Sequence, residues 1–587
     1  MCGIYGITDH DPEFIHKYID ICKHRGPDGE RVWSDAENRI TLGHNLLSIM
    51  GDPSMTTQPW KTPKDNILIY NGEIFNYHEL KEKYKDKGFV DTTGCDTELL
   101  AWGLDMYGMD FLEDIDSMHG FAYYRKQQQE LWLSRDHAGI KPLYYAEIKE
   151  GLVFGSEIKG MLDKVPGSRK VDTMAASFMA RTGINVLRNT FFSNIKKLLA
   201  GETLVYDLPN KKIKNTHRTL IKPTSNYKFN PHEFKRQVRD TVKMCSIGRR
   251  KLGIFLSGGL DSSMIAWEMM HINGELNSFT NRMEPNVVQG ENYNSDANAA
   301  AVLANQCGFN HKEVVITPKI FMDNWDHSIY YMEQPVYNPS MAMYSYTNKV
   351  LSDNGIVVTM AGDMGDELLA GYPKYFKMTN PEWLQKQIGK TQLESWRDVL
   401  TLWMNRIKRP LTGLVPSPIN DRVLIEEFEK CYTSELFNPD DPIGSYMALD
   451  CVSQVPEEFF SRNDKYGMSY GMEGRFPMAT KKFMKYCMDI HSSVKMGENK
   501  SQTKILSKKV YQGMLPDVII NKQKTGWTVP IGNWLTSSVD TDLNKFYKDR
   551  TRNANTSASK WSTKSSKNLV PTWQVHEWAK KYQMEFK

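Results

Sequence analysis

The second half of the chain is organised around the stretch KLGIFLSGGLDSS at residues 251–263. An apolar run at residues 253–256 leads into a serine and glycine loop, and the run MIAWEMM follows, so the pattern predicts a strand, a tight loop and a helix start. Glycines let the backbone approach a ligand, hydroxyls donate hydrogen bonds, and free N–H groups at a helix start attract anions. We therefore expect a pyrophosphate-binding loop made of Ser257, Gly258, Gly259, Leu260, Asp261, Ser262 and Ser263.

Asp261 is unusual in such a loop, because a carboxylate repels phosphate oxygens unless a divalent cation lies between them. We therefore predict that Asp261 is a Mg²⁺ ligand. The loop is not a Walker loop, which ends in G-K-[ST]. It resembles instead the pyrophosphate-binding loop of N-type ATP pyrophosphatases, which cleave ATP between the α and β phosphates and adenylate a substrate. The alternative is a serine and glycine loop without a ligand.

Length and composition limit the class of protein. A chain of 587 residues is too long for one core, so two or more domains are expected. The net charge of +4, with no basic block interleaved with aromatics, argues against a nucleic-acid partner. No apolar run approaches the roughly 18 residues of a membrane span, and a signal-peptide pattern is absent, so we expect a cytoplasmic protein. The eight cysteines lack CxxC spacing, which argues against zinc and against a disulfide framework.

The pattern of short apolar runs changes along the chain. Before about residue 160 many short β-type runs with few helices predict packed antiparallel sheets in an α+β domain. After about residue 230 strand candidates alternate with helices, which predicts a parallel sheet of α/β type. Residues 161–229 are predicted as a connector. Residues 541–587 are predicted as a C-terminal tail without an evident function, with a last helix at residues 572–583.

Cys2 stands directly after the initiator methionine. Removal of Met1 would leave a thiol and a free α-amino group on one residue, and this amine, with a pKa of about 8, can act as the base for its own nucleophile. The alternative is an ordinary thiol that happens to be second.

Four further runs accompany Cys2: HRGPD (24–28), NGEI (71–74), GCDTE (94–98) and RDHAGIKPLY (135–144). Together with SGGLDSS they make the chain resemble a class II glutamine amidotransferase domain fused to an asparagine-synthetase-type ligase domain, over nearly its whole length. The resemblance implies an N-terminal αββα sandwich at residues 2–160 and an N-type ATP pyrophosphatase domain at residues 230–540.

The resemblance also implies roles for residues of the first domain. Cys2 would attack the side-chain amide of glutamine, and Asn71 with the backbone N–H of Gly72 would form the oxyanion hole. Asp96 would hold the α-amino group of glutamine, and Glu73 is a further predicted substrate-binding residue.

Leu46 is a departure from the family. The family carries H-x-R-L-S-I, whose arginine binds the α-carboxylate of glutamine, whereas this chain reads HNLLSI at residues 44–49. Two interpretations stay open: a neighbouring basic residue or a shifted loop replaces the arginine, or glutamine binding is weakened.

In the second domain an apolar run ends in the loop AGDMGDE at residues 361–367, at the sheet edge where ligands gather in α/β folds. By resemblance, Asp366 would share Mg²⁺ with Asp261, Asp363 would lie near the acceptor and the attacking ammonia, and Gly362 would contact ATP. A surface-exposed acidic loop is the alternative. Lys504 would stabilise charge on the phosphates, with Lys500 as a weaker candidate, and Glu333 belongs to the segment resembling the substrate pocket.

These residues together predict an ATP-dependent amide ligase. By the resemblance, the acceptor carboxylate would attack the α-phosphorus of ATP, pyrophosphate would leave, and ammonia from glutamine, or free ammonia, would attack the acyl-adenylate. Aspartate is the favoured acceptor, with ATP and Mg²⁺ as cofactors and small molecules as partners; a homodimer is left open. Two alternatives remain: amidation of another carboxylate, such as a cell-wall amino acid or a sugar acid, or a non-catalytic member of the family.

Overall fold

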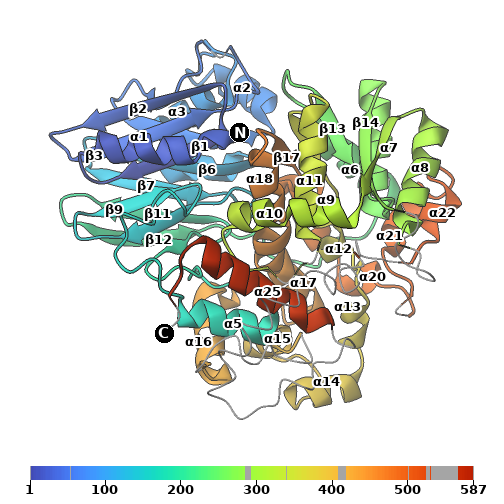
Figure 1. The fold of residues 1–587 in the computed structure, drawn as a ribbon. Coiled ribbons are helices and arrows are strands. Elements are labelled where there is room, and N and C mark those ends of the chain that lie inside the picture. The colour runs from blue at the N-terminus through green and yellow to red at the C-terminus, as the bar shows by residue number, and fades with distance from the viewer. Residues whose placement is uncertain are drawn as a thin grey trace.

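Three β-sheets organise the protein in the computed structural model (Figure 1). The structure describes residues 2–585 except 53, 285–292, 337, 339, 407–417, 500, 524–528 and 530–565, and it describes no side chains for residues 566–573. Lys500 and the segment 541–565 of the predicted tail therefore lie outside the described residues.

Two six-stranded antiparallel sheets form the N-terminal part. The first has the order β10 (Lys196–Lys197), β8 (Tyr144–Glu147), β9 (Leu152–Gly155), β1 (Cys2–Ile7), β3 (Ile40–Leu46) and β2 (Gly29–Asp35). The second has the order β12 (Lys212–Arg218), β11 (Glu202–Asp207), β7 (Glu130–Arg135), β6 (Ser117–Arg125), β5 (Ile67–Ile74) and β4 (Trp60–Lys61). Strands β10 to β12 come from the segment predicted as a connector, so that segment contributes to both sheets.

Alternation of side chains along the strands makes these sheets a four-layer sandwich. Ile67 and Ile69 of β5 face the core between the two sheets, whereas Leu68 and Tyr70 point the other way. The outward residues of β5 pack on α2 (Tyr77–Lys85) and α3 (Asp96–Tyr107), and those of β1 pack on α1 (Pro12–Ile21). The predicted αββα arrangement is confirmed.

The third sheet is parallel, with the order β15 (Asn310–Ile316), β14 (Asn277–Met283), β13 (Leu252–Phe255), β16 (Val358–Met360) and β17 (Glu473–Arg475). One face packs on α6 (Pro231–Cys245), α7 (Leu260–Asn273) and α8 (Ser295–Cys307), through residues such as Ile254 and Met360. The other face packs on α10 (Trp325–Met332) and α11 (Met341–Asp353), through Phe255 and Phe279. The predicted α/β class of the second part is confirmed.

The structure describes further helices besides those named so far. They are η1 (Lys23–Arg25), η2 (Gly108–Asp110), α4 (Phe111–Asp114), α5 (Thr173–Thr182), α9 (Pro318–Asp323), α12 (Gly365–Leu368), α13 (Pro373–Lys377), α14 (Pro381–Ile388), α15 (Trp396–Met404), α16 (Asp421–Cys431), η3 (Ser434–Leu436), α17 (Pro442–Val452), the π-helix η4 (Val455–Phe460), α18 (Ser461–Met468), η5 (Pro477–Ala479), α19 (Lys481–Met488), α20 (Ser492–Lys495), α21 (Ile505–Tyr511), α22 (Asp517–Ile520) and α25 (Ser566–Lys581). Within the described ranges no helix combines the length and the apolar composition that a membrane crossing needs.

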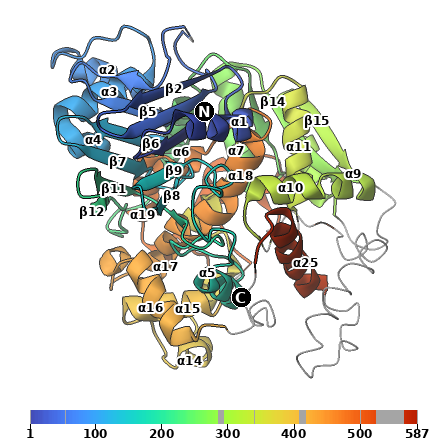
Figure 2. The ribbon, with the colours of Figure 1, turned by 60° about the vertical axis from the view of Figure 1, so that its left-hand side comes forward.

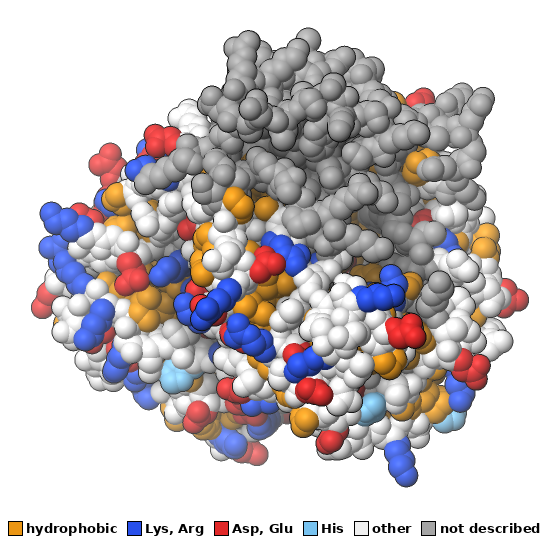
Figure 3. All heavy atoms as spheres, turned by 90° about the horizontal axis from the view of Figure 1, so that it is seen from below, with side chains coloured by type: hydrophobic (Ala, Val, Ile, Leu, Met, Phe, Trp, Pro, Cys, Tyr) orange, Lys and Arg blue, Asp and Glu red, His pale blue; other side chains and the backbone are white. Residues whose placement is uncertain are grey.

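Helix α18 lies between the sandwich and the parallel sheet (Figures 1 and 2). The C-terminal helix α25 packs across the front of the molecule in Figure 1, against α10. Its Trp578 is fully buried, with ring centroids 5.6 Å from Phe191 and 5.2 Å from Phe192. On the face seen from below, acidic and basic side chains are interspersed among hydrophobic ones (Figure 3).

Candidate active sites

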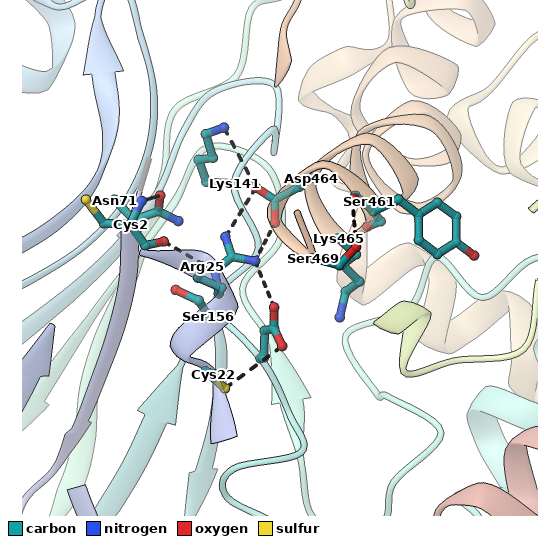
Figure 4. A network of polar contacts seen from close by, with 12 residues as sticks. Cys2, Cys22, Arg25, Asn71, Lys141, Ser156, Ser461, Asp464, Lys465 and Ser469 are labelled. Carbon is teal, nitrogen blue, oxygen red and sulfur yellow. Dashed lines mark hydrogen bonds and ion pairs between the residues drawn. The ribbon is translucent and has the colours of Figure 1, made fainter. Parts of the chain in front are cut away.

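The first candidate site lies at the start of β1. The backbone N of Cys2 donates a 2.9 Å hydrogen bond to Oδ1 of Asn71 on the neighbouring sheet (Figure 4). The other amide atom of Asn71, Nδ2, is buried and has no hydrogen-bond partner among the described residues. Burial raises the pKa of the Cys2 thiol, so the thiol is neutral until a base removes its proton. An unpartnered N–H donor beside this thiol suits an oxygen that becomes negative during a reaction.

Gly72 follows Asn71 in β5 and has no room for a side chain. A Cβ atom there would lie 2.2 Å from the backbone oxygen of Met118 and 2.7 Å from the ring of Tyr70. Glycine therefore lets β5 and β6 pair closely beside Cys2.

Two buried carboxylates lie near Cys2. Asp96, the first residue of α3, accepts hydrogen bonds from the Tyr70 hydroxyl at 3.0 Å and the Ile74 backbone N at 2.9 Å. Glu73 accepts a 3.0 Å hydrogen bond from Nη2 of Arg475, and its Oε1 is buried without a described partner. Burial raises the pKa of both carboxyl groups. The structure thus brings Cys2, Asn71, Glu73 and Asp96 together.

Leu46 ends β3 directly opposite Cys2. The segment that follows it contacts the second part of the chain, because the backbone N of Arg249 donates to the oxygen of Ile49 at 3.2 Å. Nη2 of Arg250 lies 3.7 Å from Oδ2 of Asp28, which accepts a hydrogen bond from the backbone N of Ser48 at 2.8 Å. Both arginines are exposed. They are two basic residues that the second part of the chain brings to this region.

The second candidate site is a cavity of about 350 Å³ at the carboxyl end of the parallel sheet. Residues from three separate segments meet there. Nζ of Lys504 contacts Oδ2 of Asp261 and lies 2.6 Å from Oδ1 of Asp366. The three residues that the sequence predicted to act together on phosphates are therefore in direct contact.

Glycines allow the loops of this cavity to meet. Gly258 has a φ of +70°, and a Cβ atom there would lie 2.1 Å from the backbone oxygen of Asp296. A Cβ at Gly362 or at Gly365 would lie 2.8 or 2.6 Å from side-chain carbons of Asp261. Any larger residue would separate the SGGLDSS loop from the AGDMGDE loop.

The predicted loop residues do not all face the cavity. Its lining includes Ser257, Gly259, Leu260, Asp261, Ser262, Gly362, Asp363, Asp366 and Lys504. Gly258 packs behind the loop, and Ser263 is fully buried. Asp363 accepts a 3.0 Å hydrogen bond from Nδ2 of Asn463 on α18.

Glu333 was predicted to bind substrate, and the structure places it elsewhere. It does not line the cavity. Its carboxylate accepts hydrogen bonds from the backbone N of Ile158 at 3.0 Å and of Lys159 at 2.8 Å, and it contacts Nζ of Lys465. Glu333 thus belongs to a buried ionic cluster between the two parts of the chain, where all its oxygens already have partners. We assign it no contact with substrate.

Several residues that line the cavity were not predicted as site residues, among them Arg462, Lys508 and Glu367. Lys508 of α21 donates its backbone N to the oxygen of Lys504, the residue just before the helix, at 3.0 Å. Burial, with the charges of Asp366 and Asp450, raises the pKa of Glu367 to about 8. The i, i+4 spacing of the lysines is the signal by which the sequence could have indicated Lys508.

Comparison with known proteins agrees with this arrangement. The family described as asparagine synthase matches residues 233–584, and the family described as glutamine amidotransferase domain matches residues 1–218. The chain belongs to the asparagine synthase family. It is accordingly a ligase of amino-acid biosynthesis that carries a glutamine amidotransferase domain, in a family that uses ATP.

Curated relatives are similar over most of their length. Asparagine synthetase [glutamine-hydrolyzing] 1 of Bacillus subtilis is 24% identical over 593 residues, covering 92% of this chain and 89% of that protein. Asparagine synthetase B of Escherichia coli is 24% identical over 553 residues, covering 91% and 83%. A putative asparagine synthetase of Methanocaldococcus jannaschii is 26% identical over 414 residues, covering 66% and 78%. The asparagine synthase family member described here thus shares both domains with the first two relatives.

Proposed function

We propose that this protein converts aspartate to asparagine through an aspartyl-adenylate, with ammonia that Cys2 releases from glutamine. The net reaction consumes ATP, aspartate and glutamine, and it yields asparagine, AMP, pyrophosphate and glutamate. The two sites described above carry the two halves of this reaction.

Cys2 is the nucleophile of the glutaminase half. After removal of Met1, the nitrogen that now donates to Oδ1 of Asn71 is the free α-amino group, so Asn71 orients the base that takes the thiol proton. The thiolate attacks the side-chain amide carbon of glutamine, and the unpartnered Nδ2 of Asn71 stabilises the oxyanion. Collapse of this intermediate breaks the C–N bond, the amine returns its proton to the leaving ammonia, and water hydrolyses the thioester to glutamate.

Glu73 and Asp96 bind the substrate of this half. Both are buried carboxylates beside Cys2. A bound α-ammonium group would supply the positive charge that a buried carboxylate needs to stay ionised. Arg475 already neutralises one oxygen of Glu73, at 3.0 Å.

Lys504 stabilises charge in the ligase half. The carboxylate of aspartate attacks the α-phosphorus of ATP, and the bond to pyrophosphate breaks. The Lys504 ammonium is placed between two carboxylates and can turn to the phosphate oxygens that gain charge.

Asp261 and Asp366 fit a Mg²⁺ site. They are two carboxylates in one cavity, and Mg²⁺ in nucleotide sites takes one or two carboxylates and completes its shell with phosphate oxygens and water. When bound, this ion would neutralise the pyrophosphate that leaves. Asp363, at the other side of the same loop, accepts a proton from ammonia as ammonia attacks the acyl carbon and AMP departs.

The observation that carries the proposal is the meeting of Asp261, Asp366 and Lys504 in one cavity, from segments more than 100 residues apart. The test is product analysis with ATP, aspartate and ammonium chloride, in which we expect asparagine, AMP and pyrophosphate in equal amounts. Formation of ADP and phosphate would show that the reaction does not pass through an acyl-adenylate. Pyrophosphate release with other carboxylates but not with aspartate would show that aspartate is not the acceptor.

A further inference from the structure

In the described part of the chain, two of the four cations that line the ATP-site cavity form no ion pair. The cationic residues of the lining are Arg462, Lys504, Lys508 and Lys522. Lys504 contacts two aspartates and Lys522 contacts Asp296. Among the described residues Arg462 and Lys508 form no ion pair. Burial and the charge of the neighbouring Lys504 lower the pKa of Lys508. Arg462 is therefore the unpaired cation away from the lysine cluster.

The side chain of Arg462 is held in place by two aromatic rings. Its Cζ lies 4.8 Å from the ring centroid of Tyr344 and 5.4 Å from that of Phe459. Its Nε is buried and has no hydrogen-bond partner in the described part of the chain. A guanidinium fork held by stacking matches the two oxygens of a carboxylate, and a buried N–H group without a partner is costly. This geometry favours the binding of an anionic ligand at Arg462.

Arg462 lies at the Asp363 end of the cavity. Asn463, the next residue of α18, binds Asp363 at 3.0 Å, and the hydroxyl of Tyr344 donates to Asn463. Asp366, three residues after Asp363, instead faces Lys504. The AGDMGDE loop therefore has Asp366 at the lysine cluster and Asp363 against α18, the helix that carries Arg462.

We propose that Arg462 binds the free carboxylate of a dicarboxylic acceptor, the one that is not adenylated. This inference rests on the proposed function and names the feature that would select its substrate. The reacting carboxylate lies toward Lys504 and the phosphates, and the second carboxylate lies against the fork of Arg462. An acceptor with one carboxylate would leave the guanidinium unpaired, so Arg462 selects acceptors with two.

The test compares L-aspartate with 3-aminopropanoate, which has the same chain without the α-carboxylate. Pyrophosphate release is measured with ammonium chloride as nitrogen donor, so that Cys2 does not contribute. We expect wild type to prefer aspartate, and Arg462→Gln to lower kcat/KM for aspartate by about 10–150-fold, mainly through KM. The rate with 3-aminopropanoate and the KM for ATP should not change.

Two further variants sharpen the result. Arg462→Lys keeps the charge but loses the fork, and we expect an intermediate KM for aspartate. Arg422→Gln makes the same change on the surface of α16, where the side chain is 86% exposed, and should match wild type. If Arg462→Gln does not fold, Arg462→Lys provides the same comparison of the two acceptors.

Three results would overturn the inference: no preference for aspartate in wild type, a preference that survives in both Arg462 variants, or an equal loss with both acceptors and a raised KM for ATP. The last would make Arg462 a phosphate-binding residue. Failure of the proposed function is distinguishable, because wild type would then release no pyrophosphate with aspartate.

Discussion

Nη1 of Arg25 lies 2.8 Å from Oδ2 of Asp464, and this buried pair joins the N-terminal sandwich to α18 of the ligase part (Figure 4). Nε of Arg25 also donates to the backbone oxygen of Cys2 at 3.2 Å. Asn463, the neighbour of Asp464, binds Asp363 in the ligase cavity. One turn of α18 thus touches residues next to both candidate sites, so the position of each site depends on this helix.

We expect Arg25→Gln to lower the free energy of unfolding by about 3–5 kcal/mol, because it leaves the carboxylates of Asp464 and Glu157 buried without this partner. Chemical denaturation measures the change. The double variant Arg25→Gln with Asp464→Asn should lose less than the sum of the single variants. Simple additivity would show that the pair does not couple the two parts.

The predicted metal ligands can be tested separately from the glutaminase site. Asp261→Asn and Asp366→Asn should each abolish pyrophosphate release, because a neutral amide is a poor Mg²⁺ ligand. Glutamine hydrolysis should persist in both. Asp353→Asn, at the exposed end of α11, serves as the matched control. Near-normal pyrophosphate release in either cavity variant would exclude that residue from the metal site.

Leu46 gives a prediction about glutamine use. If nothing replaces the family's arginine, Leu46→Arg should improve kcat/KM for glutamine by about 10–150-fold, mainly through KM. The rate with ammonium chloride should stay the same, and Leu46→Met should behave as wild type.

Arg249→Gln and Arg250→Gln test the opposite interpretation of Leu46, since the backbone of Arg249 contacts Ile49 and the side chain of Arg250 lies near Asp28. A raised KM for glutamine in either variant, with no gain from Leu46→Arg, would show that a neighbouring arginine already binds the carboxylate.

The sequence predicted the layers of the fold, because alternation such as that of Ile67 to Tyr70 follows the two faces of a strand. It did not reveal β2 (Gly29–Asp35), a largely exposed and polar strand, or β17 (Glu473–Arg475), which has only three residues, two of them charged. Such strands carry no periodic signal, and their place is set by the neighbours with which they pair.

For the candidate sites, the sequence indicated residues in motifs but not contacts that depend on how distant elements pack. Among the motif residues, Cys2 contacts Asn71 and Asp261 contacts Lys504. The sequence did not indicate the contact of Glu333 with Lys465, because the same carboxylate in a motif could face a substrate or a buried lysine. Arg462 was not recognised as a site residue because its contacts with Tyr344 and Phe459 depend on how α18 and α11 pack.

The C-terminal helix α25 has a structural role that the sequence did not indicate. Trp578 is fully buried, and its Nε1 donates to the backbone oxygen of Glu333 at 3.1 Å. We expect Trp578→Ala to cost about 3–5 kcal/mol in denaturation, with Trp578→Phe costing less. Val518→Ala, at a position that is 49% exposed, is the control. Unchanged stability of Trp578→Ala would show that α25 contributes little to the folded state.

The central claim is that two sites act in sequence, with ammonia passing from one to the other. Cys2→Ala tests it most directly, by comparing asparagine formation from glutamine with asparagine formation from ammonium chloride. We predict that the variant loses the glutamine-dependent rate and keeps the ammonium-dependent rate, whereas Cys307→Ala, at a half-buried thiol on α8, keeps both. Equal loss of both rates in Cys2→Ala, or continued synthesis from glutamine, would contradict the account.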